Sequence, residues 1–136
     1  LRLRALTHAP AIAMLAALLL LDRRSDTPVE LKDKGRGAVL RWRGRDVGPL
    51  MASMHAFARD QGWYPSVPPH GALDDRSLEG IARGLGVVER VGKRMVMSEG
   101  LFLKLQEDHE ARLVYEALLP LADRMHRWLE QVPLSS

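Results

Sequence analysis

Apolar and polar positions along the chain predict a mostly helical protein with a strand-containing segment near its middle. The run from Ala9 to Leu21 is apolar on every side and is made of strong helix formers. With 13 residues it is shorter than the ~20 needed for a membrane span. An apolar helix of this length usually lies inside a core or an interface. We therefore predict a buried helix over residues 8–24.

Strand signals follow over residues 27–46. Thr27 precedes a proline, which disfavours the helical region and favours a short extended stretch there. The next segment alternates with a period of two, which places on one face Ala38, Leu40 and Trp42. The other face then carries Val39, Arg41, Arg43 and Arg45. This pattern predicts one half-buried strand with a basic outer face.

Two helices are predicted within residues 49–98. The first runs from Pro49 to Gln61, with apolar residues at helical spacing: Leu50, Met54, Phe57 and Ala58. The second runs from Asp75 to Gly84 and places on one face Leu78, Ile81, Ala82 and Leu85. Three prolines within residues 63–71 exclude a regular helix between the two, so a loop is expected there.

A hairpin is predicted over Val87–Met97. The dipeptide Gly92-Lys93 lies between two short apolar stretches, and glycine in the first position suits a type II′ turn. This is the clearest local signal in the chain. The hairpin and the two helices before it together form a predicted unit over residues 49–98.

A long C-terminal helical region is predicted over residues 99–132, with Ser98 as its cap. The polar group from Gln106 to Glu110 either interrupts it or is exposed, and Pro120 bends or splits it. Four-three spacing relates Val114, Leu118, Leu121, Met125, Trp128 and Val132. This stripe either packs against the chain's own N-terminal helix or forms a homodimer or partner interface. The interface residues would be Val114, Leu118, Leu121, Met125 and Trp128.

Length and composition place these elements in one α+β domain, residues 1–136, that is mostly helical, with a small β-hairpin and a long C-terminal helix. There is no cysteine, so neither disulfides nor thiolate zinc sites can form. The formal net charge of +3 is a mild bias toward anionic partners. A cytoplasmic location is the default for such a composition.

The N-terminal residues resemble a secretory signal only in part. Arg2, Arg4 and His8 precede the apolar run, but the run passes directly into Asp22 and two arginines rather than into small residues suited to cleavage. We expect no membrane attachment, with an uncleaved anchor or signal as the alternative.

Enzyme chemistry has little support in the residue pattern. The five histidines are scattered over different predicted elements without metal-ligand spacing. Asp108-His109-Glu110 fits a solvated helix surface, and no glycine loop has the residues of a phosphate-binding motif. We expect no enzymatic activity, no cofactor and no metal.

Basic residues are the more informative group because several predicted elements present them. The candidates for nucleic-acid binding are Arg41, Arg43, Arg45, Arg76, Arg83, Arg90, Lys93 and Arg94. Cations on a helix and on an adjoining hairpin can neutralise phosphates on both sides of a groove. A mixed, solvated surface is the alternative, because acidic residues lie nearby in the sequence: Asp74, Asp75, Glu79 and Glu89.

The order of helix, helix, hairpin and helix resembles the winged-helix superfamily of nucleic-acid-binding domains. The resemblance is carried by RSLEGIARGLG at residues 76–86 and VERVGKRMV at residues 88–96. It implies that the helix before the hairpin enters a groove, with Arg76 and Arg83, and that the hairpin tip meets the backbone, with Lys93 and Arg94. The departure is the loop between the helices, which is far longer than a helix-turn-helix turn.

Two functions follow as expectations. The first is DNA binding in a regulatory or architectural role, such as transcription regulation, by a cytoplasmic homodimer. The second is a non-enzymatic structural or adaptor subunit that docks on a protein partner through its apolar terminal helices. One structural feature distinguishes the two functions. A surface shared by Arg83, Lys93 and Arg94 with Arg41–Arg45 would favour nucleic-acid binding, and its absence would favour the adaptor role.

Overall fold

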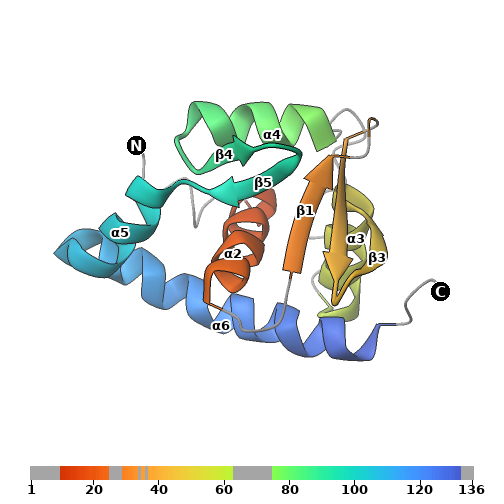
Figure 1. The fold of residues 1–136 in the computed structure, drawn as a ribbon. Helices are drawn as coiled ribbons and strands as arrows, with labels where there is room; N and C mark the ends of the chain where they lie inside the picture. Colours follow the sequence, from red (N-terminus) through yellow and green to blue (C-terminus); the bar gives the residue numbers. More distant parts are fainter. Residues whose placement is uncertain (1–9, 25–28, 34, 36, 63–74, 133–136) are drawn as a thin grey trace.

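The computed structural model describes residues 10–24, 29–33, 35, 37–62 and 75–132. Its elements in chain order are α2 (Pro10–Arg24), β1 (Val29–Asp33), β2 (Ala38–Trp42), β3 (Arg45–Pro49), α3 (Leu50–Asp60), α4 (Asp75–Gly84), β4 (Val88–Val91), β5 (Arg94–Met97), α5 (Glu99–Glu107) and α6 (His109–Gln131). Figure 1 shows their arrangement. The predicted class, mostly helical α+β with a long C-terminal helix, is confirmed.

The strands form one antiparallel sheet in the order β3-β2-β1-β5-β4. The predicted hairpin is present as β4 and β5, but it is part of a larger sheet than the sequence indicated. Strand β1 lies in the middle, where Leu31 pairs with Leu40 of β2 on one side and with Met95 of β5 on the other. One short strand therefore joins two hairpins.

The single strand predicted over residues 38–45 is wrong. Strand β2 ends at Trp42, and the chain reverses at Arg43 and Gly44, both with positive φ (53° and 80°). Two consecutive positive φ values are those of a type I′ turn, which matches the twist of the strands it joins. Arg45 then begins β3, opposite Trp42. The predicted shared face of Arg41, Arg43 and Arg45 therefore does not exist.

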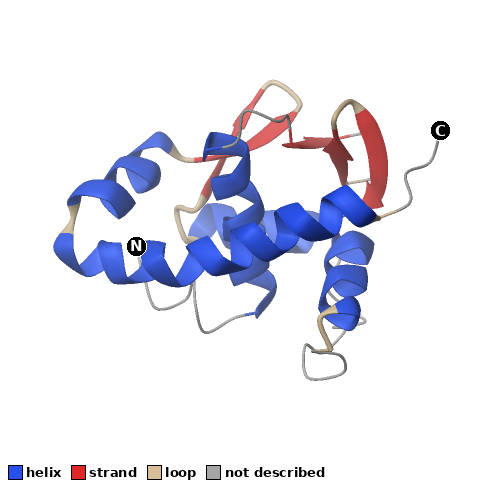
Figure 2. Ribbon diagram, turned by 90° about the horizontal axis from the view of Figure 1, so that it is seen from below, coloured by secondary structure: helices blue, strands red, loops and turns tan. Residues whose placement is uncertain are grey.

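Helix α2 is the centre of the core, as predicted for the apolar N-terminal run. Leu15 and Leu20 have no exposed surface, and both helix faces are covered. The helix contacts α6 as well as strands β1 and β5. Figures 1 and 2 show it packed between the sheet and α6, with α4 on the opposite side of the molecule from α6. No described helix is long and apolar enough to cross a membrane.

The C-terminal region consists of two helices, because the chain turns at Asp108. The Asp108 carboxylate accepts hydrogen bonds from the backbone N–H groups of Glu110 and Ala111 and so begins α6. These bonds, that from Ala111 foremost, lower the pKa of Asp108 below its usual value. Pro120 does not split α6, which continues through it to Gln131. The predicted cap of α5 is confirmed, since Ser98 Oγ accepts from the Leu101 N–H.

The apolar stripe of α6 packs within the chain. Leu118, Met125 and Trp128 are buried, while Val114 and Leu121 are half-buried. The packing against the chain's own core accounts for Leu118, Met125 and Trp128, and a homodimer or partner contact through this stripe stays a prediction. The predicted loop at residues 63–71 lies outside the described residues.

Candidate nucleic-acid interface

Helix α4 is attached to the β4–β5 hairpin through one buried carboxylate. Glu79 of α4 is 5% exposed, and Arg90 of β4 donates to both of its oxygens, from Nε at 2.9 Å and from Nη2 at 2.9 Å. Arg83 forms a further ion pair with Glu79 one turn along the helix. Hydrogen bonds from Arg90 lower the pKa of Glu79, and the same contact raises the pKa of Arg90. Both groups are therefore charged at neutral pH.

The hairpin tip is attached to β1 through Asp33, the last residue of that strand. The Asp33 N–H donates to the Lys93 carbonyl at 2.8 Å. Its Oδ1 accepts from the Gly35 N–H at 2.7 Å, and its Oδ2 accepts from Arg90 at 2.8 Å. Asp33 therefore contacts Gly35, the hairpin tip at Lys93 and, through Arg90, the ion pair with Glu79 of α4. Figure 1 shows the arrowhead of β1 beside the hairpin tip.

A hollow of about 470 Å³ lies at these contacts, lined by Lys32, Asp33, Gly35 and Lys93. Lys93 is exposed and Lys32 half-buried, and neither ammonium has an acidic partner among the described side chains. A second, smaller hollow next to α4 is lined by Glu79, Gly80, Arg83 and Arg90.

Arg94 is ion-paired within the protein, although 41% of its side chain remains exposed. Its Nη2 donates to both carboxylate oxygens of Asp22 on α2, at 3.0 and 3.1 Å, and its Nε lies 3.9 Å from Glu30. Burial raises the pKa of Asp22, and Arg94 offsets this only in part. A buried carboxylate needs such a partner, so Arg94 is best explained as stabilising the fold.

Arg41, Arg43 and Arg45 lie elsewhere. Trp42 pairs with Val29 at the start of β1, whereas Lys93 bonds to Asp33 at its end. Four residue steps at about 3.3 Å each separate these two ends by roughly 13 Å. Arg41 is paired with Asp46, and Arg43 stacks on the Trp42 ring at 4.9 Å. The basic candidates are therefore divided between two ends of the sheet and do not share one surface. The shared surface that would have favoured nucleic-acid binding over an adaptor role is absent from the described part of the structure, and any nucleic-acid interface is limited to the residues beside α4 and the hairpin.

Of the predicted residues on the α4 side, Arg83 and Lys93 face solvent near the hairpin, and Arg90 and Arg94 are ion-paired within the fold. The side chain of Arg76 lies outside the described part. Sequence reasoning missed Lys32, although it alternates with the buried Leu31 on a strand. That alternation was the available signal for a polar, outward-facing position.

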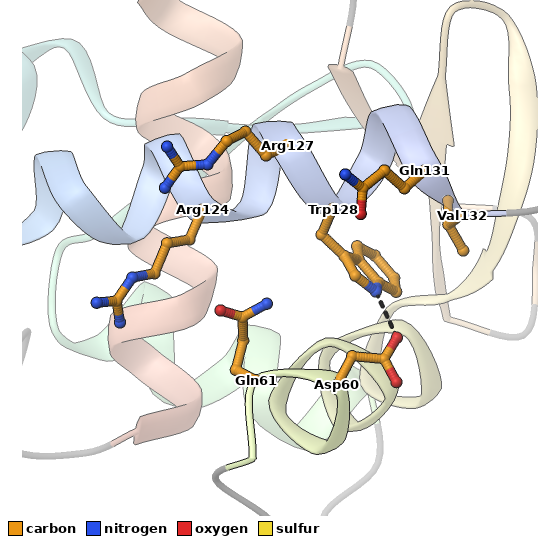
Figure 3. A pocket seen from close by; sticks show the side chains of 7 residues that line it. All are labelled: Asp60, Gln61, Arg124, Arg127, Trp128, Gln131 and Val132. Atoms are coloured by element: carbon orange, nitrogen blue, oxygen red, sulfur yellow. Dashed lines mark hydrogen bonds between the residues drawn. The ribbon is translucent and has the colours of Figure 1, made fainter.

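A larger hollow of about 620 Å³ lies on the other side of the molecule, where α3 and α6 end. It is lined by Asp60, Gln61, Arg124, Arg127, Trp128, Gln131 and Val132 (Figure 3). Trp128 donates its indole N–H to Asp60 Oδ2 at 2.8 Å and packs edge-on against Phe57. Two helix C-termini and Asp60 offset the charge of the arginines here, so the hollow is not a strong anion site. Within the described ranges, no group of three acidic or histidine side chains could hold a metal.

Comparisons with protein-family models, with curated proteins and with solved structures found no match for this chain.

Proposed function

We propose that the protein binds nucleic acid, with duplex DNA as the first candidate, through α4 and the β4–β5 hairpin. The observation that carries the proposal is the Arg90–Glu79 contact, which fixes the hairpin against α4 and leaves Arg83 and Lys93 exposed beside it. Cations held in a fixed relation by a rigid support are what phosphate contacts require. The ion pair of Arg83 with Glu79 does not prevent Arg83 from contacting a phosphate, because Arg90 still donates two hydrogen bonds to the Glu79 carboxylate when Arg83 moves away.

The arrangement of elements supports a winged-helix-like unit as part of this proposal. Helix α2, strand β1, helices α3 and α4, and the β4–β5 hairpin follow one another, and β1 pairs with β5. The β2–β3 hairpin is an additional element between β1 and α3. In this proposal α4 enters a groove and the hairpin tip meets the phosphate backbone.

The residues proposed to bind are fewer than those the sequence indicated. Arg83 and Lys93 are retained, and Arg76, whose side chain lies outside the described residues, stays a prediction. Arg90 and Arg94 support the fold, and the three arginines near the β2–β3 turn are not included. An adaptor role through the apolar helices is not proposed, because α2 and most of the α6 stripe pack in the chain's own core.

The test is a titration of the whole protein against labelled duplex DNA, single-stranded DNA and RNA over a salt series. We expect salt-sensitive binding, with the slope of log K against log salt reduced by about 0.9 for each duplex phosphate that a variant no longer neutralises. Arg83→Ala and Lys93→Ala should each weaken binding, while their circular dichroism and unfolding midpoints stay near those of the parent protein.

The matched control is Arg127→Ala, which removes the same charge from an exposed position on α6. Figure 1 shows α6 on the opposite side of the molecule from α4. Arg127→Ala should leave affinity and salt slope near the parent values. Absence of binding to all three nucleic acids at low salt would overturn the proposal. Equal decreases in affinity for the three variants would show that only net charge matters and would reject α4 and the hairpin as the binding surface.

A further inference from the structure

We infer that the β1–β2 turn and the hairpin tip form one phosphate clamp, in which Lys32 and Lys93 together hold a single phosphate of a nucleic-acid backbone. This inference rests on the proposed function and deepens it. It adds a binding residue, Lys32, on a strand outside the helix-and-hairpin unit, and it assigns Asp33 as a positioning residue.

The two lysines are brought together by backbone geometry. The Asp33 N–H donates to the Lys93 carbonyl at 2.8 Å, and Lys32 immediately precedes Asp33 on β1, where it pairs with Arg94. The Gly35 N–H donates to Asp33 Oδ1 at 2.7 Å and so holds Gly35 next to Asp33. Gly35 has φ +93°, a conformation that L side chains rarely adopt. Backbone hydrogen bonds therefore place Asp33, Gly35 and Lys93 next to one another without any ligand.

The charge of Asp33 does not cancel that of the lysines. One of its oxygens accepts from the Gly35 N–H and the other from the Arg90 guanidinium. Arg90 and Arg83 together supply two positive charges for the two carboxylates of Asp33 and Glu79. No ion pair joins Lys32 or Lys93 to an acidic side chain among the described residues. Two unpaired cations beside one hollow favour an anion between them.

A phosphate group suits the charge of this hollow, which is also wide enough to admit the neighbouring sugar-phosphate backbone. The hollow is open, holds about 470 Å³ and is lined by two lysines, one glycine and one aspartate. An ammonium group offers three rotatable donors and acts as a point charge, so two of them can share one phosphate without a fixed fork geometry. A backbone phosphate of a bound duplex is therefore the expected occupant.

The experiment uses the full chain with Lys32→Gln, Lys93→Gln and the double variant, since glutamine keeps the aliphatic stem and removes the charge. Lys104→Gln, exposed on α5, is the matched control. If the two lysines hold one phosphate, the salt slope of the double variant should fall by about 0.9 and that of each single variant by less. Two separate phosphates would instead give additive decreases, about 1.8 in the double variant, and this would overturn the shared clamp.

A second measurement separates the clamp from the proposed function. Inorganic pyrophosphate is titrated at low salt while the amide signals of Gly35 and Lys93 are followed by NMR, in the parent protein and in the double variant. Shifts in the parent that vanish in the double variant support the clamp, even if no nucleic acid binds. Nucleic-acid binding that is unaffected by Lys32→Gln, with no pyrophosphate shifts, rejects the clamp and leaves the proposed function standing.

Discussion

Arg90 of β4 donates two hydrogen bonds to the carboxylate of Glu79 on α4, each 2.9 Å long, and Glu79 is almost completely buried. A two-bond fork of this kind fixes orientation as well as distance. The same guanidinium also binds Asp33 on β1. One arginine therefore determines how α4, the hairpin and the central strand lie relative to one another.

Removal of Glu79 should destabilise the protein more than removal of an exposed acid. In Glu79→Ala, Arg90 loses two hydrogen bonds and part of its charge compensation, which should cost about 2–3 kcal/mol of unfolding free energy. Urea unfolding followed by circular dichroism measures this. Glu89→Ala, an exposed neighbour of Arg90 on β4, should change stability by less than about 0.5 kcal/mol. Equal effects of the two changes would show that the buried fork has no special weight.

The contribution of Glu79 should depend on pH. Hydrogen bonds from Arg90 hold its folded-state pKa below the ordinary value of 4.5. Its stabilisation is therefore complete above that ordinary value and is lost as pH falls through the lower folded-state pKa. The unfolding free energies of the parent and of Glu79→Gln should differ most near neutral pH and converge in acid. A difference that grows on acidification would contradict the assigned direction.

The hydrogen bond between Trp128 and Asp60 should stabilise the packing of α3 on α6. In Asp60→Ala the buried indole N–H loses its acceptor, which should cost about 1–2 kcal/mol. Asp60→Asn retains an acceptor oxygen and should be destabilised less. Thermal unfolding compares both with Asp123→Ala, an exposed aspartate on α6. The same stability for all three variants would show that the bond contributes nothing measurable.

Pro120→Ala should stabilise α6. Proline lacks the backbone N–H that would bond one turn back, and its ring disfavours the helix interior by about 3 kcal/mol relative to alanine. Pro120 is exposed, so alanine needs no repacking, and a gain of roughly 1–3 kcal/mol is expected. Ala117→Gly, one turn earlier and also exposed, should change stability by about 1 kcal/mol in the opposite direction. A decrease in stability in Pro120→Ala, measured by urea unfolding, would mean that the helix depends on its proline.

Gly80→Ala should raise the stability of the protein and weaken its binding to nucleic acid. Gly80 lies within α4 with ordinary helical φ, and a Cβ there would meet nothing within 4 Å. Alanine should therefore raise stability by about 0.5–1 kcal/mol. If α4 approaches nucleic acid closely, the added methyl group on its exposed face should weaken binding in the same salt-series titration. Increased stability with unchanged affinity would place this face of α4 outside the nucleic-acid interface.

Local signals account for the elements that were predicted well. Helix α4 was predicted with its observed bounds, because its apolar residues follow helical spacing and Gly86 has the positive φ that ends it. The β4–β5 turn was predicted because Gly92 has the positive φ (63°) that a II′ turn requires in its first position. In contrast, Arg43 adopts positive φ as a non-glycine residue, so the alternating pattern concealed the turn and strand β3 after it.

The sequence by itself determined the α+β class, the buried N-terminal helix and the positions of the main helices, because spacing, capping and turn chemistry act between near neighbours. Only the tertiary structure decided which charges are available to a partner. Arg90 meets Asp33 across 57 positions, and Arg94 meets Asp22 across 72. Such pairs form through the packing of distant segments, and no local pattern records them. The same packing removed two predicted arginines from the candidate interface and placed Lys32 beside Lys93.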